Sequence, residues 1–343
     1  MKANLFSTWY NVLITAVILF LAYKFLPLFL KWAVFEAVWS GGQSSDCRPD
    51  GACWVYLRVW FNNFLLFTYP QEEAWRVVAA FGLLAAVVTA LLARVPSARV
   101  KTWLGVFFFL VYPIIAVTLF YGGVFNLPVV ETRLWGGLFL TLVIAITGIV
   151  GSLPLGILLA LGRRSQLPLV KSACVAFIEL WRSVPLITVL FMASVMFPLF
   201  MPEGVNFSKL LRAIIGVILF SAAYNAEVIR GGLQAIPRGQ YEAANSLGLG
   251  YWKTMGFIIL PQALKIVIPG LVNNFIGIFK DTSLVLIIGM FDFLGAAQAI
   301  STNPEWIGHT LEGYLFVGLG YFLFCFAMSS YSQRLERKLR TDR

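Results

Sequence analysis

The sequence predicts an all-α integral membrane protein with about eight transmembrane helices. Hydrophobic residues make up 59% of the 343 residues and charged residues only 12%, and the mean hydropathy is +0.82. Soluble domains carry roughly twice that charged fraction. The apolar residues gather in stretches close to the ~20 residues that a helix needs to cross a bilayer. The expected spans cover residues 11–34, 75–94, 103–121, 133–161, 173–198, 210–230, 262–289 and 311–331.

The first span carries Lys24 and Pro27. We expect a kink at the proline, and we expect the lysine to reach toward the interface or toward protein. A cleaved signal peptide is the alternative for an apolar stretch so near the N-terminus. The apolar sequence continues far past any plausible cleavage site, so we interpret this span as a retained anchor.

Lys and Arg predict how the spans are oriented, because cytoplasmic loops carry an excess of these residues. One set of loops holds Lys2, Arg94, Arg99, Lys101, Arg163, Arg164, Lys171, Arg230, Arg238, Lys253, Lys265, Arg334, Arg337, Lys338, Arg340 and Arg343. The opposite set holds only Arg48, Arg58, Arg133 and Lys209. We therefore expect the first set and both termini to be cytoplasmic. This distribution also accounts for the net charge of +10 without a nucleic-acid partner.

The four cysteines divide by their expected topology. Cys174 and Cys325 fall in spans, where cysteine acts as a small packing residue. Cys47 and Cys53 fall in the first external loop, where an oxidising compartment permits a disulfide. We expect no metal site there, because no histidine is near and two cysteines are too few ligands. The single histidine, His309, is expected to be a polar residue at the external membrane surface.

A polar segment over residues 240–252 lies between strongly apolar stretches and has the composition of a short helix. Pro237 and Gly239 are expected to end the preceding helix. Glu242 is then expected in a first helical turn, where the helix dipole favours an anion. Gly248 suits the left-handed position that ends a helix.

Ala243 and Ala244 follow Glu242 in this segment. Alanine favours a helix and has almost no side chain, so a partner surface could approach the backbone closely. An ordinary surface helix in a loop is the alternative interpretation of the same residues.

The spacing of the segment carries further information. The E-A-A triplet at 242–244 is followed by three residues, by Gly248, and nine residues later by I-x-L-P ending at Pro261. This pattern resembles the cytoplasmic E-A-A loop of ABC-importer permeases. The resemblance implies a coupling helix that seats in a groove of an ATPase subunit. The residues that it places at this contact are Gly239, Glu242, Ala243, Ala244, Leu247 and Gly248.

Three further segments are similar to the polar amino-acid permease branch of that family, the histidine/glutamine type. They are Glu179–Leu186 with the pattern E-x-x-R-x-x-P-L, Tyr224–Gly232 with Y-x-A-E-x-x-R-G-G, and Lys280–Leu284 with K-D-T-S-L. The resemblance implies a five-helix permease core of the type I importer fold. It divides the chain into a three-helix N-terminal extension with an external loop, 1–130, the core, 131–333, and a basic cytoplasmic tail, 334–343. Such extensions occur in permeases of general L-amino-acid systems, which pair two different permeases.

Two pairs of charged residues in these segments are one helical turn apart. Glu179 and Arg182 can pair inside the membrane, either beside the substrate path or only to fix helix packing. Glu227 and Arg230 repeat the spacing at the cytoplasmic end of the next span, where we expect them to brace the E-A-A loop. Pro185 frees a backbone carbonyl, which is tolerated where a cavity or a neighbouring helix satisfies it.

Polar residues lie deep in the seventh span, at Asn274, Asp281, Thr282 and Ser283. Polar groups at such depth are costly and usually face a bundle interior or a water path. An amino acid carries an ammonium and a carboxylate, so its path needs acceptors and donors. We therefore expect these residues along the substrate path; the alternative is that they hold the span against a partner permease.

The chain lacks the motif of an ATPase. The nearest segment to a G-x-x-x-x-G-K-[ST] loop, residues 248–254, has Trp252 where glycine is needed. We expect no enzyme activity and no cofactor bound by this chain, with ATP and Mg²⁺ in a separate ATPase. The resemblance implies a permease subunit of an amino-acid importer in the bacterial inner membrane. It also implies two ATPase copies, a second homologous permease in a heterodimer, and a periplasmic amino-acid-binding protein.

Two other classes of function are compatible with a multi-pass membrane protein. An ion-coupled secondary amino-acid transporter would use membrane charges such as Asp281 without an ATPase. Inverted repeats would favour it, and none is detected. A membrane-embedded enzyme would need a cluster of acid, base, nucleophile or metal ligands, which a chain with one histidine does not suggest.

Overall fold

The computed structural model describes residues 7–93, 97–202, 204 and 207–341. Within these ranges the chain forms α-, 3₁₀- and π-helical segments and isolated bridges, but no β-strand. Lys2, Arg94 and Arg343, three of the basic residues that predict orientation, lie outside the described residues.

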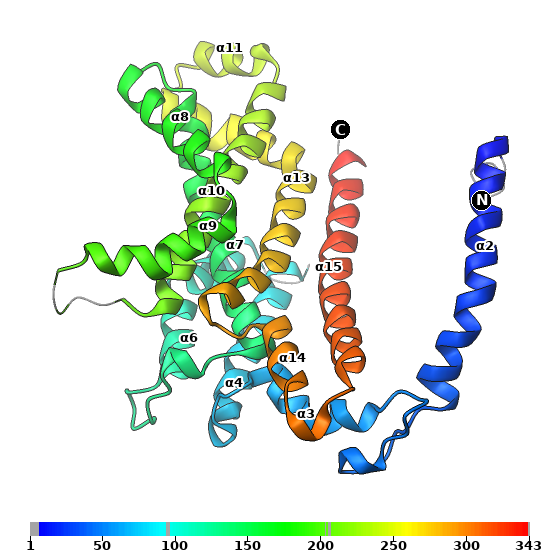
Figure 1. The fold of residues 1–343 in the computed structure, drawn as a ribbon. Helices are drawn as coiled ribbons and strands as arrows, with labels where there is room; N and C mark the ends of the chain where they lie inside the picture. The colour runs from blue at the N-terminus through cyan, green and yellow to red at the C-terminus, as the bar shows by residue number, and fades with distance from the viewer. Residues whose placement is uncertain (1–6, 94–96, 203, 205–206, 342–343) are drawn as a thin grey trace. The chain divides into compact units, whose positions relative to one another are not determined.

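Helices follow one another along the whole described chain, as labelled in Figure 1. They are α2 (Trp9–Leu30), α3 (Trp54–Leu66), α4 (Ala74–Leu92), α5 (Ala98–Val106), α6 (Tyr112–Tyr121), α7 (Gly137–Arg163), α8 (Pro168–Ser183), α9 (Leu186–Phe191), α10 (Lys209–Ala235), α11 (Arg238–Ser246), α12 (Tyr251–Lys253), α13 (Leu260–Asp281), α14 (Phe293–Ser301) and α15 (Thr310–Thr341). Among the described residues, seven helical stretches are long and apolar enough to cross a membrane, and α8 with α9 adds an eighth, broken span. The predicted all-α fold with about eight spans is confirmed.

The span expected over 173–198 is broken in the middle. The chain turns by 100° between Pro168–Ser183 and Leu186–Phe200. Val184 and Pro185 have extended backbone, with φ,ψ of −109°,133° and −61°,143°. Proline has no N–H to donate and disfavours helical backbone in the residue before it, so Pro185 ends one helix and precedes the next.

The chain forms two compact units. One comprises residues 1–62 and 297–318, and the other residues 63–296 and 319–343. The second unit contains the E-A-A segment and every predicted site residue except the two external cysteines.

Helices α7, α10 and α13 pack against one another in the second unit (Figure 1). Small residues allow the close approach: a Cβ added to Gly156 of α7 would lie 2.8 Å from the Cβ of Asn225 in α10. Membrane helices associate through such close backbone contacts, because lipid tails are as apolar as the side chains and provide no hydrophobic driving force. Gly156 therefore fixes the spacing of α7 and α10.

Aromatic side chains join the later part of the N-terminal extension to the predicted core. The ring of Phe120 in α6 lies 4.9 Å from that of Phe139 in α7 and 5.7 Å from that of Trp135. Tyr69 meets Phe139 edge-on at 5.4 Å. These four side chains are at most 6% exposed. The helices on the two sides of residue 131 therefore share one hydrophobic core.

The first unit contains α2 and the loop of the external cysteines. No residue of α2 is buried. The loop is held by local polar contacts: the N–H groups of Gly42 and Gln43 donate to Asp46 Oδ2 at 2.9 and 3.1 Å. These two bonds, that of Gly42 first, lower the pKa of the Asp46 carboxyl.

Candidate functional site

The segment expected to form one helix over 240–252 is shorter than predicted and starts earlier. α11 begins at Arg238, directly after Pro237, whose backbone is extended. Gly239 therefore lies inside α11 and not in the break before it. Glu242 lies beyond the first turn, which holds no acidic residue. These two expectations are wrong because Pro237 alone sets the boundary. Proline has no N–H to donate, and at the start of a helix this N–H would have no partner within the helix in any case.

The C-terminal end of α11 agrees with the prediction. Gly248 has a φ of +69°, in the left-handed region. The N–H groups of Gly248 and Leu249 donate to the carbonyls of Asn245 and Ala244 at 2.9 and 3.2 Å. This pair of bonds is the Schellman motif, which satisfies the last carbonyls of a helix. The chain is thereby turned sharply into α12.

The two alanines of the triplet lie in different environments. Ala244 is 1% exposed and packs into the second unit, whereas Ala243 and Glu242 are exposed. Leu247 and Trp252 are also exposed, by 76% and 72%. A partner surface can therefore meet Ala243, Leu247 and Trp252, while Ala244 anchors α11 to the rest of the unit.

A tyrosine connects α11 to two membrane-spanning helices. The Tyr241 hydroxyl donates to the carbonyl of Leu233 near the end of α10 at 3.3 Å. It accepts from Nη1 of Arg164, which follows α7, at 3.2 Å. The guanidinium of Arg164 also lies 5.8 Å from the centre of the Tyr241 ring. In the sequence Arg164 indicates orientation only, and nothing in its spacing indicates this contact.

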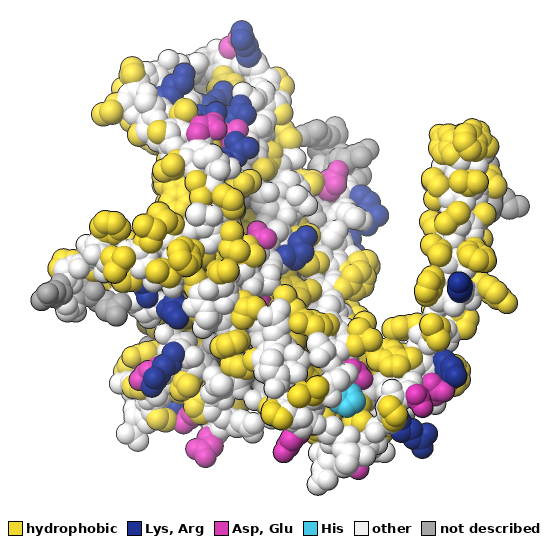
Figure 2. Space-filling model, in the orientation of Figure 1, with side chains coloured by type: hydrophobic (Ala, Val, Ile, Leu, Met, Phe, Trp, Pro, Cys, Tyr) yellow, Lys and Arg dark blue, Asp and Glu magenta, His cyan; other side chains and the backbone are white. Residues whose placement is uncertain are grey.

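Glu227 of α10 is the centre of a cluster of charges close to α11. Arg230 donates to both of its carboxylate oxygens, at 2.9–3.2 Å. Nη1 of Arg163, at the end of α7, lies 2.9 Å from Glu227 Oε1, and Nη1 of Arg182 in α8 lies 3.8 Å from Oε2. Figure 2 shows dark blue and magenta side chains gathered near α8 and α11 of Figure 1. The predicted Glu227–Arg230 pair is therefore present, within a larger cluster.

The expected ion pair between Glu179 and Arg182 is not found among the described residues. Glu179 instead pairs with Nη1 of Arg163 at 2.9 Å. Arg182 reaches toward Glu227 and lies over the ring of Tyr224 at 5.6 Å. The prediction is wrong because the end of α7 supplies a closer cation, which the spacing along α8 could not reveal.

A row of polar side chains crosses the packed helices α7, α10 and α13. The amide of Asn274 donates to Asn225 Oδ1 at 3.1 Å, and the amide of Asn225 donates to Ser152 Oγ at 3.0 Å. Asn225 and Ser152 are 0% exposed. Asn274 was predicted along the substrate path, and here it is hydrogen-bonded within the helix bundle.

The other predicted path residues lie at the end of α13. Thr282 is 1% exposed, and its hydroxyl donates to the carbonyl of Phe279 at 2.8 Å. The Ser283 hydroxyl donates to the carbonyl of Lys280 at 2.9 Å. Asp281 is half-buried. Hydroxyl groups bonded back to their own helix remain able to accept one more hydrogen bond.

One fully buried carboxylate, that of Asp292, was not predicted from the sequence. Asp292 is 0% exposed, and it accepts from the hydroxyl of Tyr321 at 2.9 Å and from the N–H of Gly295 at 2.9 Å. The N–H of Phe293 donates to the hydroxyl of Thr141 at 3.0 Å. Asp292 thus caps α14 and ties it to α15, while the bond of Phe293 ties the same helix to α7; these contacts indicate a structural role.

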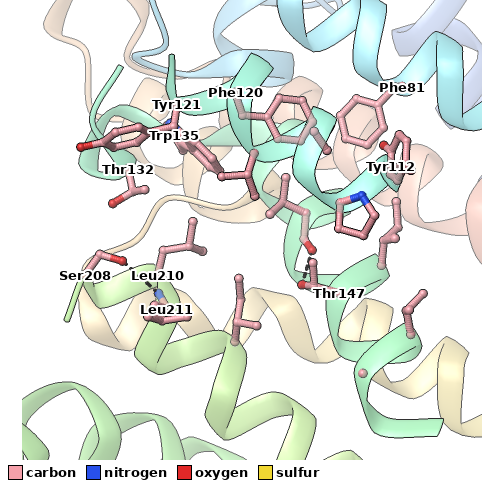
Figure 3. Close-up of a pocket in the computed structure, with 18 of the residues that line it drawn as sticks. Phe81, Tyr112, Phe120, Tyr121, Thr132, Trp135, Thr147, Ser208, Leu210 and Leu211 are labelled. Atoms are coloured by element: carbon pink, nitrogen blue, oxygen red, sulfur yellow. Dashed lines mark hydrogen bonds between the residues drawn. The ribbon is translucent and has the colours of Figure 1, made fainter. Parts of the chain in front are cut away.

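A cavity of about 790 Å³ lies between α6, α7 and α10 (Figure 3). Phe81, Tyr112 and Phe120 form one wall, and Leu210 and Leu211 face them. The charged residues among its described lining, Glu131 and Arg133, form an ion pair at 2.6 Å. Such a lining suits apolar matter and offers little to the two charges of an amino acid.

The external cysteines lie closer to a histidine than the sequence suggested. Cys47 and Cys53 form a disulfide, with their Cα atoms 5.5 Å apart. His309 lies beside it, with its ligand nitrogen within 4.8 Å of both sulfurs. Nδ1 of His309 is 3.5 Å from Glu312 Oε1, which also accepts from the Cys53 N–H at 2.9 Å. The expectation that no histidine is near was wrong, because His309 lies 256 positions after Cys53 in the sequence and only the fold brings the two together.

The chain resembles known proteins over its whole length. A model of the family described as "Binding-protein-dependent transport system inner membrane component" matches residues 152–341. The inner membrane amino-acid ABC transporter permease protein YhdY of Escherichia coli is 52% identical, over 100% of this chain and 93% of that protein. The glutamate/glutamine/aspartate/asparagine transport system permease protein BztC of Rhodobacter capsulatus is 41% identical, over the same shares of the two chains.

The fold also matches a solved transporter. The crystal structure of an amino acid ABC transporter with histidines superposes with a TM-score of 0.52 and 30% identity. The match covers 59% of this chain and 92% of that chain.

Proposed function

Because the chain belongs to the family of inner-membrane components of binding-protein-dependent transport systems, we propose that it conducts amino acids through an ATP-driven importer. It is a multi-pass inner-membrane protein and a transport subunit, not an enzyme. The family identified from the four motifs is confirmed, and ion-coupled secondary transport is not favoured. Amino acids are the cargo named for YhdY and BztC. We propose polar or broad-range L-amino acids for this chain.

The connection between α11 and the spans is the observation that carries the proposal. α11 presents Ala243 and Leu247 to a partner on one side. On the other side, Tyr241 joins it to the ends of α7 and α10. A helix held in this way can transmit a displacement of its partner to the membrane-spanning helices.

The family implies which kinds of partner this chain has, and we propose their number and arrangement. Members of this family work with a substrate-binding protein and an ATPase. We further propose two ATPase copies, which hold ATP and Mg²⁺, and a second, different permease. With both termini cytoplasmic, as the basic residues predict, α11 faces the ATPase.

The charge cluster suggests how the movement is passed on. Closure of the ATPase pair displaces α11, and Tyr241 conveys the displacement to Arg164. The neighbouring Arg163 holds Glu179 of α8 and Glu227 of α10 together. The ends of α7, α8 and α10 therefore move as one body. This movement closes the substrate path on one side of the membrane and opens it on the other. Hydrolysis of ATP resets the assembly.

We place the substrate path along α13 and the turn that follows it. Asp281, Thr282 and Ser283 offer a carboxylate and hydroxyl oxygens at the end of α13, and Asn274 lies two turns earlier. The charges of Glu179 and Arg182 are engaged in the cluster beside α11. We therefore propose that Glu179 and Arg182 serve the coupling of α11 to the spans and do not primarily contact the substrate.

Purification of this chain with its partners tests the function. Co-purification of a Walker-motif ATPase, followed by ATP-dependent uptake of labelled amino acids into liposomes, is the expected result. The liposomes need the periplasmic binding protein on the outside and a panel of amino acids to establish the range. Uptake driven by a proton or sodium gradient, without ATP, would contradict the proposal.

A further inference from the structure

A second cavity, of about 670 Å³, lies at the broken span between α8, α9 and α10. Its volume is in the range of roughly 300–1,000 Å³ that is usual for small-molecule sites. Apolar and aromatic side chains form most of its lining, among them Trp181, Met192, Met196 and Phe197. Among the described residues that line it, Arg212 in the first turn of α10 is the one that carries a charge.

Arg212 has no counter-ion among the described residues. Its Nη1 donates to the backbone carbonyls of Ser194 and Ala193, in the π-helical turn Met192–Met196. Its Nε is shut off from solvent and meets no acceptor. No carboxylate of the described chain lies within 4 Å of its guanidinium. Within the described part of the chain, backbone carbonyls alone meet the guanidinium, and no carboxylate compensates its charge in this largely apolar cavity.

Two physical effects make this arrangement costly without an anion. A charged side chain within a membrane span is expensive unless it faces a partner or a water-filled cavity. The first turn of a helix also carries the positive end of the helix dipole, which does not stabilise a cation. The first turn of α10 holds no acidic residue that would offset this effect. An anion bound in the cavity relieves both effects.

The lining indicates which anion fits. Nη2 of Arg212, which makes no bond to the backbone carbonyls, can donate a charge-assisted hydrogen bond to a carboxylate oxygen. Thr188 offers a hydroxyl and Trp181 an aromatic face, each of which can receive an ammonium group. Met192 and Met196 are unbranched and adaptable, so they can pack against side chains of different shape.

We propose that this cavity is the site at which the permease holds its amino-acid cargo, with the α-carboxylate of the amino acid on Arg212. The inference rests on the proposed function and adds the site and the group that is recognised. All α-amino acids share the carboxylate that Arg212 recognises. Met192 and Met196 can adapt to different side chains, so the site can hold more than one amino acid.

Variants of Arg212 in the reconstituted importer test the assignment. Uptake of labelled L-glutamine is measured over a range of concentrations, with the binding protein present. Arg212→Gln should lower uptake about 10- to 100-fold, the equivalent of one charge-assisted hydrogen-bond pair. Arg212→Lys, which keeps the charge but loses the planar guanidinium and its bonds to the π-helical turn, should retain part of the uptake. Lys209→Gln is the matched control, because it removes a charge from the same helical turn outside the cavity, and its uptake should equal that of the wild type.

Direct binding to the wild-type complex gives a second test that depends on no variant. Labelled L-glutamine is bound to the detergent-solubilised complex without its binding protein. Unlabelled L-glutamine should displace it, whereas the analogue with an amide in place of the α-carboxylate should displace it at least tenfold less well.

The outcomes separate this inference from the proposed function. If the wild type takes up no amino acid, the proposed function fails and the inference with it. If the wild type transports and Arg212→Gln transports equally well, only the inference fails. If an anionic phospholipid co-purifies with the wild type but not with Arg212→Gln, Arg212 binds a lipid phosphate. If both Arg212 variants lose the second permease, Arg212 binds a carboxylate of that partner. Either result would overturn the cargo site.

Discussion

At the scale of single residues, two side chains connect α11 with the membrane spans. Tyr241 uses its hydroxyl as both donor and acceptor, and Glu227 gathers guanidinium groups from three helices. The contacts with Arg164, Arg163 and Arg182 could not be predicted from spacing, because these residues lie in segments distant from Tyr241 and Glu227. The sequence did predict the local pair of Glu227 with Arg230, since side chains three residues apart on a helix are neighbours. The same spacing gave no pair at Glu179 and Arg182, because Arg163 of α7 engages Glu179.

Tyr241→Phe should loosen the coupling between ATP hydrolysis and transport. The change removes the hydrogen bonds to Leu233 and Arg164, worth about 0.5–1.5 kcal/mol each, but keeps the ring and its packing. The ratio of amino acid transported to ATP hydrolysed should fall, and the complex should still assemble. Tyr251→Phe is the control, because Tyr251 lies in α12 of the same segment and is 51% exposed. An unchanged ratio in Tyr241→Phe would show that this tyrosine carries no coupling.

Glu227→Gln and Glu179→Gln should differ in severity. Removal of the Glu227 charge leaves three guanidinium groups close together, and its side chain is only 16% exposed. Glu179 is 55% exposed and pairs with Arg163 alone, so solvent can replace it. We expect Glu227→Gln to destabilise the subunit by about 1–3 kcal/mol and Glu179→Gln by much less. Thermal unfolding of the purified complex, followed by size-exclusion chromatography, measures the difference; equal losses in the two variants would argue against a cluster centred on Glu227.

At the scale of elements, apolar stretches and turn residues predicted the positions of helices better than the spacing of charged residues predicted ion pairs. Long apolar stretches located the spans, and Gly248 located the end of α11. The start of α11 was placed too late, because Pro237 and Gly239 were both taken as breaks when the proline alone was sufficient. The turn of 100° at Pro185 was not predicted. The proline indicated a weakened helix, but the angle depends on the helices that pack on each half.

The end of α11 can be tested with two glycines that differ only in backbone conformation. Gly248 has a φ of +69° and Gly250 a φ of −69°, and a Cβ added at either position meets nothing within 4 Å. Gly248→Asp should therefore cost about 1 kcal/mol through its backbone and distort the turn into α12. Gly250→Asp adds the same charge at the N-cap of α12, where aspartate is favoured. We expect Gly248→Asp to lose uptake and Gly250→Asp to keep it. Loss in both would indicate that the charge, and not the left-handed turn, disturbs the ATPase contact.

At the scale of the whole molecule, the packing crosses the boundary that the motifs suggested. All recognised motifs lie after residue 131, which led to the division between an extension, 1–130, and a core, 131–333. Motifs record the contacts that a family shares, and they do not report which helices pack together. In the structure the later helices of the extension, α4 and α6, belong to the same compact unit as α7, α10 and α13. The predicted division therefore separates sequence patterns and does not describe two independently packed bodies.

The shared core predicts that the extension stabilises the permease. Residues 131–343 expressed alone should lose the partners of Trp135 and Phe139 and give a less stable complex than the full chain. Co-expression of residues 1–130 as a separate chain should restore much of the stability, because α6 can still pack. Phe120→Ala in the full chain should weaken the same contacts by about 3–5 kcal/mol, the usual cost of removing a buried phenylalanine. Phe109→Ala is its control, since Phe109 is 56% exposed. If residues 131–343 alone are as heat-stable as the full chain, or if Phe120→Ala and Phe109→Ala are equivalent, the aromatic cluster does not join the two parts.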